Sequence, residues 1–373
     1  MSPHLDRIYL DYNASAPLSF GVKDVVADAL ESVGNPSSIH SAGKKAKSIL
    51  NKTRHILASH MDASPPCFIF TSGGTEANAL ALKGLDIDVI LVSAIEHTSV
   101  YAIAQDRSDV LFKEIPVTPE GIVNLEALKK MLDALQGKKV LVSVMMANNE
   151  SGTLQPIAEI NEIMRFYNGF FHVDAVQAFG KIPISLKDLP VDLMSFSSHK
   201  IGGCMGVGAL YIREGISLKA LYRGGGQEHR MRSGTENVPG IAGFGKALEN
   251  ITFSQWEKVR RHRDFLEVCL QEKMQEERDD FYIASQRVPR LPNTSLIARP
   301  KLLSETQVIH LDLKGICVSS GAACSSGVVK KSRVLHAMGM KEDYQKSAIR
   351  VSLGPTTTSG EIEKFIATYC HLG

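Results

Sequence analysis

The chain has 373 residues, of which 44% are hydrophobic and 22% charged, a balance typical of a soluble globular protein with about two domains. Its 42 basic and 40 acidic residues leave a formal net charge of +2, which gives no electrostatic reason to expect nucleic-acid or membrane-surface binding. The sequence contains no apolar stretch near the ~18 residues that span a bilayer, and no signal-peptide core or Arg-rich targeting segment at its start. We therefore expect a cytoplasmic protein.

The first two thirds of the chain alternate between strand-like and helix-like segments. Short apolar runs predict strands at 67–71, 89–93, 140–145, 170–173 and 208–212. One predicted helix has an apolar face made by Val22, Val26, Leu30 and Val33. Strands with nearly continuous hydrophobicity are typical of sheets that are covered on both faces. We therefore expect residues 13–248 to form a large α/β domain with a mainly parallel sheet.

The pattern changes near residue 248. A densely charged segment running to about residue 280 carries an apolar stripe at helical spacing, made by Trp256, Val259, Leu266 and Leu270. Strand-like pieces follow at 293–298, 316–319 and 349–353, with two helices among them. We expect a long, partly exposed helix and then a smaller α+β domain, formed by residues 249–373 together with 1–12.

Two polar residues follow apolar strands of the predicted sheet. Asp174 lies at the carboxyl end of a strand, the edge at which open α/β sheets bind ligands, and a carboxylate there can pair with a pyridinium nitrogen. Lys200, in the sequence Ser-Ser-His-Lys, is placed to form a Schiff base with an aldehyde. Taken alone, Asp174 fits a helix cap equally well, and Lys200 fits a solvated loop lysine.

A Gly-Gly turn between a strand and a helix, in segment 71–78, predicts a phosphate site. Glycines let the backbone approach an anion, and the following helix start offers free N–H groups. An ordinary strand–helix turn is the alternative. With a phosphate cradle, a ring-nitrogen partner and a Schiff-base lysine in one α/β domain, the chain has the parts that pyridoxal 5'-phosphate (PLP) binding requires.

These segments resemble the cysteine desulfurases, which are class-V members of the fold-type I PLP-dependent transferases. The resemblance is carried by segments 71–78, 94–97, 148–152, 172–177, 197–200 and 232–235, and it extends from about residue 10 to about residue 364. It implies a large PLP-binding α/β domain with a small α+β domain. It also implies removal of sulfur from L-cysteine, which leaves L-alanine.

The resemblance assigns roles to individual residues. Lys200 would hold the cofactor and then remove the substrate α proton, and His97 would stack on the ring and move a proton. The implied cofactor-binding set is Gly74, Thr75, His97, Asn149, Asp174, Gln177, Ser197, His199, Lys200 and Thr235. The implied substrate-binding set is Asn13, Asn149 and Arg350, and no metal is expected. Without the resemblance, Arg350 would be an outward-facing strand residue.

Cys324 lies in a segment, 319–327, that is rich in small residues and typical of a loop. The resemblance makes it the catalytic thiol that receives sulfur as a persulfide, whereas the alternative is an incidental exposed thiol. The six cysteines form no C-x-x-C pair, so neither a structural zinc site nor a disulfide framework is expected.

Partners are implied in the same way. Thr235 and Gly224–Gly226 match a segment that reaches the partner subunit's cofactor in the family, which implies a homodimer. An iron–sulfur scaffold or another sulfur-acceptor protein would take the persulfide sulfur, and Lys330, Lys331 and Arg333 either dock its acidic surface or begin a solvated helix. Rival functions are transamination, a lyase reaction on selenocysteine, and a non-catalytic partner protein with the same fold.

Overall fold

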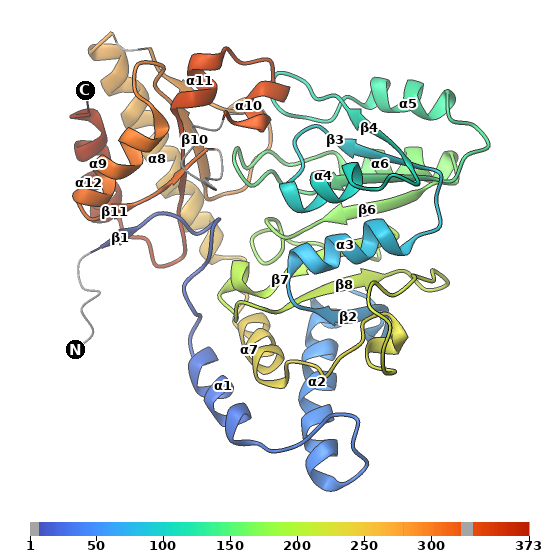
Figure 1. The fold of residues 1–373 in the computed structure, drawn as a ribbon. Coiled ribbons are helices and arrows are strands. Elements are labelled where there is room, and N and C mark those ends of the chain that lie inside the picture. The colour runs from blue at the N-terminus through green and yellow to red at the C-terminus, as the bar shows by residue number, and fades with distance from the viewer. Residues whose placement is uncertain (1–6, 279, 322–330, 373) are drawn as a thin grey trace.

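The computed structural model describes residues 7–278, 280–321 and 331–372. The described residues form a seven-stranded sheet in the order β2-β8-β7-β6-β5-β3-β4 (Figure 1). Its strands are β2 (Phe68–Thr71), β3 (Val89–Ser93), β4 (Leu111–Ile115), β5 (Val140–Met145), β6 (Phe170–Asp174), β7 (Leu193–Ser197) and β8 (Gly208–Ile212). β8 is antiparallel to both of its neighbours, while the other pairs are parallel. The predicted α/β fold with a mainly parallel sheet is confirmed.

Helices cover both faces of this sheet, which explains why its central strands are apolar throughout. One face packs against α3 (Gly74–Gly84) and α4 (Thr98–Gln105). The other packs against α2 (Ser41–His60), α5 (Leu125–Asp133), α6 (Ile157–Phe166) and α7 (Val238–Glu249). Because the helices cover the two faces, the carboxyl edge of the sheet remains available to the chain segments that cross it.

The predicted apolar face of the first helix is only partly buried. α1 (Val22–Glu31) packs against α7 and buries Val22, but Leu30 and Val33 are 70% and 89% exposed. The helix ends at Glu31, so Val33 lies beyond it. The spacing correctly predicted a helix, but less of the apolar face is buried than it indicated.

A smaller unit lies beside the large sheet (Figure 1). It contains the sheet β12 (Ser319–Ser320), β13 (Ala348–Ser352), β10 (Thr294–Ala298) and β9 (Tyr282–Ile283), in that order, and the pair β1 (Ile8–Tyr9) and β11 (Ile316–Cys317). Its helices are α8 (Gln255–Glu276), α9 (Ser304–Leu313), α10 (Arg333–Ala337), α11 (Glu342–Ser347) and α12 (Ser359–Cys370). The predicted apolar stripe of α8 is buried along its whole length.

Two details of this unit differ from the prediction. The strand expected at 316–319 is two short strands that belong to different sheets. Four helices rather than two follow α8 within the described residues, because α10 and α11 are too short to show a helical period.

The N-terminal segment links the two units. β1 pairs with β11, and the chain then runs past the end of β13, where the Tyr12 amide donates to the Ser352 carbonyl at 3.1 Å. A second link comes from α8, where the indole Nε1 of Trp256 donates to the Gly180 carbonyl at 2.7 Å. None of the helices in the described ranges combines the length and apolarity needed to cross a membrane.

Candidate active site

The predicted site residues gather at the carboxyl edge of the large sheet. His97 follows β3, Asn149 follows β5, and Asp174 is the last residue of β6. Ser197 ends β7, and the short 3-10 helix Ser198–Ile201 after it carries Lys200. Parallel strands end at one edge, so residues separated by about a hundred positions meet there.

The amine of Lys200 is held by backbone carbonyls of the crossing N-terminal segment. Its Nζ donates to the Asn13 carbonyl at 2.6 Å and to the Ala14 carbonyl at 2.9 Å. Burial, with a contribution from the positive charge of Arg350, lowers the pKa of Lys200 to about 8. The interpretation of Lys200 as a solvated loop residue is wrong.

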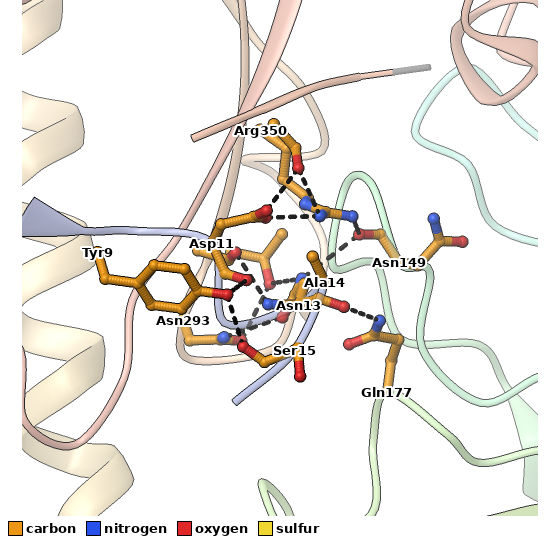
Figure 2. Close-up of polar contacts among 12 residues, drawn as sticks. Tyr9, Asp11, Asn13, Ala14, Ser15, Asn149, Gln177, Asn293 and Arg350 are labelled. Carbon is orange, nitrogen blue, oxygen red and sulfur yellow. Dashed lines mark hydrogen bonds and ion pairs between the residues drawn. The ribbon is translucent and has the colours of Figure 1, made fainter. Parts of the chain in front are cut away.

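Asn13 is the centre of a hydrogen-bond network (Figure 2). Its carbonyl also accepts from Gln177 Nε2 at 2.9 Å, and its Nδ2 donates to Thr294 Oγ1 at 2.9 Å. Its Oδ1 accepts from Lys181 Nζ at 2.7 Å and from Asn293 Nδ2 at 3.0 Å. Since every polar group of this buried side chain is used, the position of Asn13 is strongly determined.

Arg350 lies inside the site and does not face outward. The expectation from the strand alone, that Arg350 is an outward-facing residue, is therefore wrong. It is 8% exposed, and its Nη1 donates to the Asn149 carbonyl at 3.0 Å. Its Nη2 forms an ion pair with Asp11 Oδ1 at 2.8 Å (Figure 2). The neighbouring Nε is buried and has no hydrogen-bond partner among the described residues.

A chain of hydrogen bonds joins Asp174 to His97. Asn78 Nδ2 donates to Asp174 Oδ2 at 2.8 Å and to Ser99 Oγ at 3.0 Å, and Ser99 Oγ contacts His97 Nδ1 at 2.8 Å. The other carboxylate oxygen of Asp174 accepts from the Val176 amide at 2.9 Å. Asp174 thus has a side-chain contact to α3, which a mere helix cap would not make.

The ring of His97 has a defined tautomer. Its Nδ1 accepts from the Ser99 amide at 3.1 Å, so the proton of the neutral ring is on Nε2. Desolvation by the surrounding protein lowers the pKa of His97. The charges of Lys200 and Arg333 act in the same direction, and the charge of Asp174 opposes them. A neutral imidazole with a donor at Nε2 is therefore favoured.

The predicted phosphate site has the close backbone approach that its glycines imply. Gly73 has φ +153°, and α3 begins without a side-chain cap. A Cβ on Gly74 would lie 2.8 Å from Val176 Cγ2, and one on Gly208 would lie 2.6 Å from the Gly73 backbone. These positions require glycine and bring β8 against the turn.

The three other predicted phosphate ligands near this turn differ in setting. Thr75 is exposed in the first turn of α3, and Ser197 is buried with its Cβ 3.5 Å from the position of a Cβ on Gly74. His199 Nδ1 lies 3.3 Å from Ser15 Oγ. Burial and the charge of Lys200 lower the pKa of His199 to about 4, so this ring is neutral at physiological pH.

Thr235 does not join this group. Thr235 is exposed, and no hydrogen bond within the described ranges links it to the other site residues. The loop that carries it is tied to α3 by an ion pair at 3.0 Å between Arg232 and Glu76. Cys324 lies outside the described residues.

Of the basic residues after Cys324, the structure describes Lys331 and Arg333, and both contact other parts of the chain. The Arg333 guanidinium lies 3.7 Å above the Tyr101 ring and donates to the Glu96 carbonyl, and Lys331 pairs with Glu342 at 3.0 Å. Arg333 begins α10, as one alternative expected, but its guanidinium is held by these contacts and is not a free docking cation. Lys330 lies outside the described residues.

Four residues that contact this site were given no role from the sequence: Asp11, Asn78, Ser99 and Lys181. Asn78 stands inside a segment that carries the resemblance, Asp11 lies near the start of the range that the resemblance covers, and Lys181 follows Gln177 by four positions. Those positions were the available signal, but the roles come from contacts between distant segments.

Comparison with known proteins shows which family the chain resembles. Residues 8–365 match the family Aminotransferase class-V. "Cysteine desulfurase IscS" of Dictyoglomus turgidum is 38% identical over 95% of this chain and 92% of its own, and "Cysteine desulfurase" of Cereibacter sphaeroides is 38% identical over 97% and 94%.

Solved structures give the same result. A NifS-like protein from Rickettsia africae superposes with a TM-score of 0.88 at 40% identity, covering 98% of both chains. A structure described as SspA in complex with cysteine has a TM-score of 0.80 at 28% identity, covering 94% of this chain and 100% of the other. The chain therefore belongs to the cysteine desulfurase family, within the class-V aminotransferases.

Proposed function

We propose that this protein is a PLP-dependent cysteine desulfurase that converts L-cysteine to L-alanine and leaves a persulfide on Cys324. The observation that carries the proposal is the half-buried amine of Lys200 at the sheet edge that also carries Asp174 and Gln177, with a pKa lowered to about 8 by burial and by the charge of Arg350. Family membership and the cysteine complex of the related SspA support the same reaction.

The residues at the sheet edge fit PLP. A Cβ on Gly74 would lie 2.8 Å from Val176 Cγ2, so glycine allows the close packing of this turn, and the uncapped start of α3 offers backbone N–H donors. Buried Asp174 is suited to the ring nitrogen, and Gln177 to the ring hydroxyl. Thr75, Ser197, His199 and, from a second subunit, Thr235 would complete the phosphate ligands. When bound, PLP supplies an aldehyde and a protonated ring that withdraws electrons from the substrate α carbon.

The substrate carboxylate would bind to Arg350, with Asn149 and Asn13 beside it. Arginine suits this task because its planar fork binds a carboxylate through two parallel hydrogen bonds. The buried, unpartnered Nε of Arg350 is a donor that a carboxylate would satisfy. Hydrogen bonds from Arg350 to Asp11 and Asn149 already orient the guanidinium.

Proton transfer would depend on Lys200 and His97. A lysine with a pKa of about 8 has a substantial neutral fraction near physiological pH, so its Nζ can take the α proton and return it. His97 would exchange a proton with the substrate thiol. The Cβ–S bond of cysteine then breaks while a sulfur–sulfur bond forms at the Cys324 thiolate. Cysteine and the enzyme thiol become alanine and the persulfide, so atoms and electrons balance without a further reductant.

A direct test uses the purified protein loaded with PLP. We expect an absorbance band of bound cofactor that is lost in Lys200→Ala, and stoichiometric alanine with sulfide from L-cysteine and a dithiol. Cys324→Ser should keep the absorbance band and lose sulfur transfer. If the Ser variant transfers sulfur at the parental rate, the persulfide step is wrong.

The same experiments separate the rivals. Transamination would give a keto acid and would not need the Cys324 thiol, and a selenocysteine lyase would turn over selenocysteine far faster than cysteine. A protein that takes up no PLP would favour a non-catalytic role.

The proposed assembly is a homodimer in which the loop of Gly224–Gly226 and Thr235 completes the phosphate site of the partner. An iron–sulfur scaffold or another sulfur-acceptor protein would receive the sulfur in the cytoplasm, without direct contact to nucleic acid or membrane. We propose the division into a large domain, 13–248, and a small domain, 1–12 with 249–373, because separate apolar clusters lie on either side of the site.

A further inference from the structure

Lys181 is a buried lysine that the proposed reaction does not use. It is 3% exposed and follows β6 by seven residues, between Gly180 and Ile182. No carboxylate among the described residues forms an ion pair with it. A buried lysine without a carboxylate partner is costly to retain, so its contacts should reveal a role.

Both hydrogen bonds of Lys181 go to amide oxygens of predicted site residues. Its Nζ donates to Asn13 Oδ1 at 2.7 Å and to Gln177 Oε1 at 2.9 Å. Burial and the nearby positive charges of Lys200 and Arg350 lower the pKa of Lys181 well below 10.5. Whichever protonation state the amine takes, two of its N–H groups are used by these two amide oxygens.

These two bonds determine which way each amide points. Since the amine of Lys181 donates to both, the oxygens of Asn13 and Gln177 must face it and their NH₂ groups must face away. The Nε2 of Gln177 therefore points at the Asn13 carbonyl, 2.9 Å away, and Asn13 Nδ2 points at Thr294.

The consequence reaches Lys200 through Asn13. The Asn13 carbonyl accepts from both Gln177 Nε2 and Lys200 Nζ, the latter at 2.6 Å (Figure 2 shows the Gln177 contact). We propose that Lys181 is a positioning residue, which fixes the amides of Asn13 and Gln177 so that the Asn13 carbonyl orients the Lys200 amine. This inference rests on the proposed function, in which Lys200 is the catalytic amine.

The test compares the PLP-loaded parent with Lys181→Met, which keeps the length and removes the donor. Exposed Lys364→Met on α12 serves as the matched control. We expect Lys181→Met to lower kcat for L-cysteine by about tenfold or more, because a displaced reacting group slows the chemical step. We expect KM to change by a smaller factor than kcat, since Arg350, the main proposed ligand of the substrate carboxylate, is not bonded to Lys181. Parental kcat in a folded, loaded Lys181→Met protein would overturn the proposal.

A double-mutant cycle shows whether Lys181 acts through the amide network. In a Gln177→Ala background, Lys181→Met should lower kcat by a clearly smaller factor than in the parent, because one of the amides it fixes is gone. Full additivity of the two changes would contradict the proposal. Lys181→Gln, a shorter polar replacement, serves if Lys181→Met does not fold. It should lower kcat relative to the parent, because the two amide contacts of the Lys181 amine are lost, and parental kcat in this variant would likewise overturn the proposal.

A measurement on the apoprotein separates this inference from the proposed function. Acylation of Lys200 by acetic anhydride, followed by peptide mass spectrometry at a series of pH values, gives a midpoint pH for this amine. The measurement requires neither PLP nor turnover. We expect Lys181→Met to lower this midpoint, because the Asn13 carbonyl no longer stabilises the Lys200 ammonium. A raised midpoint would mean that Lys181 acts as a nearby positive charge, and an unchanged one that it has no effect on Lys200; either result overturns the proposal. If the parent releases no alanine, the proposed function fails while this readout still judges Lys181.

Discussion

Arg350 and Asp11 form an ion pair, with 2.8 Å between Nη2 and Oδ1, across 339 residues of sequence. The side chains are only 9% and 16% exposed, and Ser319 Oγ donates to the second carboxylate oxygen of Asp11 at 2.8 Å. The pair thus joins the N-terminal segment, β12 and β13 at the place where the substrate carboxylate is proposed to bind. Its loss should affect both stability and substrate binding.

We predict that Asp11→Asn destabilises the protein, because it leaves the Arg350 guanidinium buried without its counter-charge. Removing one partner of a buried pair costs about 3 kcal/mol in unfolding free energy. Urea denaturation of the apoprotein measures this value. The control is Asp312→Asn, which breaks the exposed Arg7–Asp312 pair and should cost less than about 1 kcal/mol. Equal effects for the two variants would contradict the prediction.

Glu150 gives a pH-dependent prediction. Desolvation raises its pKa from 4.5 to about 7, although a hydrogen bond from Ser332 and the charges of Arg350 and Arg333 oppose the shift. Between pH 4.5 and 7 the folded protein holds a proton on Glu150 that the unfolded chain releases, so this group's contribution to stability is lost as pH rises through that window.

Glu150→Gln should remove this dependence, because the amide is neutral throughout. We expect the variant to match the parent near pH 4.5 and to exceed it in unfolding free energy at pH 8 by on the order of 1–3 kcal/mol. Chemical denaturation of the parent and the variant at a series of pH values gives the difference in their unfolding free energies. The titration of the other groups cancels in this difference. Glu126→Gln, at an exposed position, is the control. If the curves of unfolding free energy against pH are parallel for the parent and Glu150→Gln, the prediction is wrong.

The fold was predictable because its strands carry a strong local signal. β3, β5 and β8 begin and end at the predicted residues, since burial on both faces makes such strands continuously apolar. The number of helices after α8 was underestimated, because five and six residues, the lengths of α10 and α11, are too few to establish a helical period.

The site was predictable where a residue ends such a strand or follows it closely. Asp174, Lys200 and the Gly-Gly turn were found in this way, and the resemblance supplied most of the rest. Asp11 was missed because its partner Arg350 lies 339 residues away. Lys181 was missed because its contact to Asn13 spans 168 residues, and its position four residues after Gln177 does not by itself indicate a role. Arg350 on its own was expected to face outward, but that face of β13 is covered by Asp11 and the turn of Asn149.

Gly74→Ala should weaken PLP binding. The new Cβ would lie 2.8 Å from Val176 Cγ2, so the turn has to shift, and such overpacking costs about 1–3 kcal/mol. Where about 1.4 kcal/mol of this cost falls on the PLP-bound form, Kd rises about tenfold. Fluorescence titration of the apoprotein with PLP measures this change. Gly360→Ala, whose Cβ meets nothing within 4 Å, should leave Kd unchanged, and an unaltered Kd in Gly74→Ala would remove the cradle from the proposed site.

Asn78 provides the last prediction, since it is the side chain that holds Asp174. Its Nδ2 donates to Asp174 Oδ2 at 2.8 Å, and hydrogen bonds to charged groups contribute about 1.5–3 kcal/mol. Asn78→Leu should therefore lower kcat/KM for L-cysteine by about 10- to 100-fold, and should change the absorbance of the bound cofactor, because Asp174 is less well placed against the ring nitrogen.

Ser99→Ala is the matched variant for this experiment. It removes the link between Asn78 and His97 but leaves the bond from Asn78 to Asp174. We expect a smaller fall in kcat/KM and an unchanged cofactor absorbance, because only the orientation of His97 is loosened. If Ser99→Ala and Asn78→Leu alter the absorbance equally, Asn78 acts through His97 rather than through Asp174.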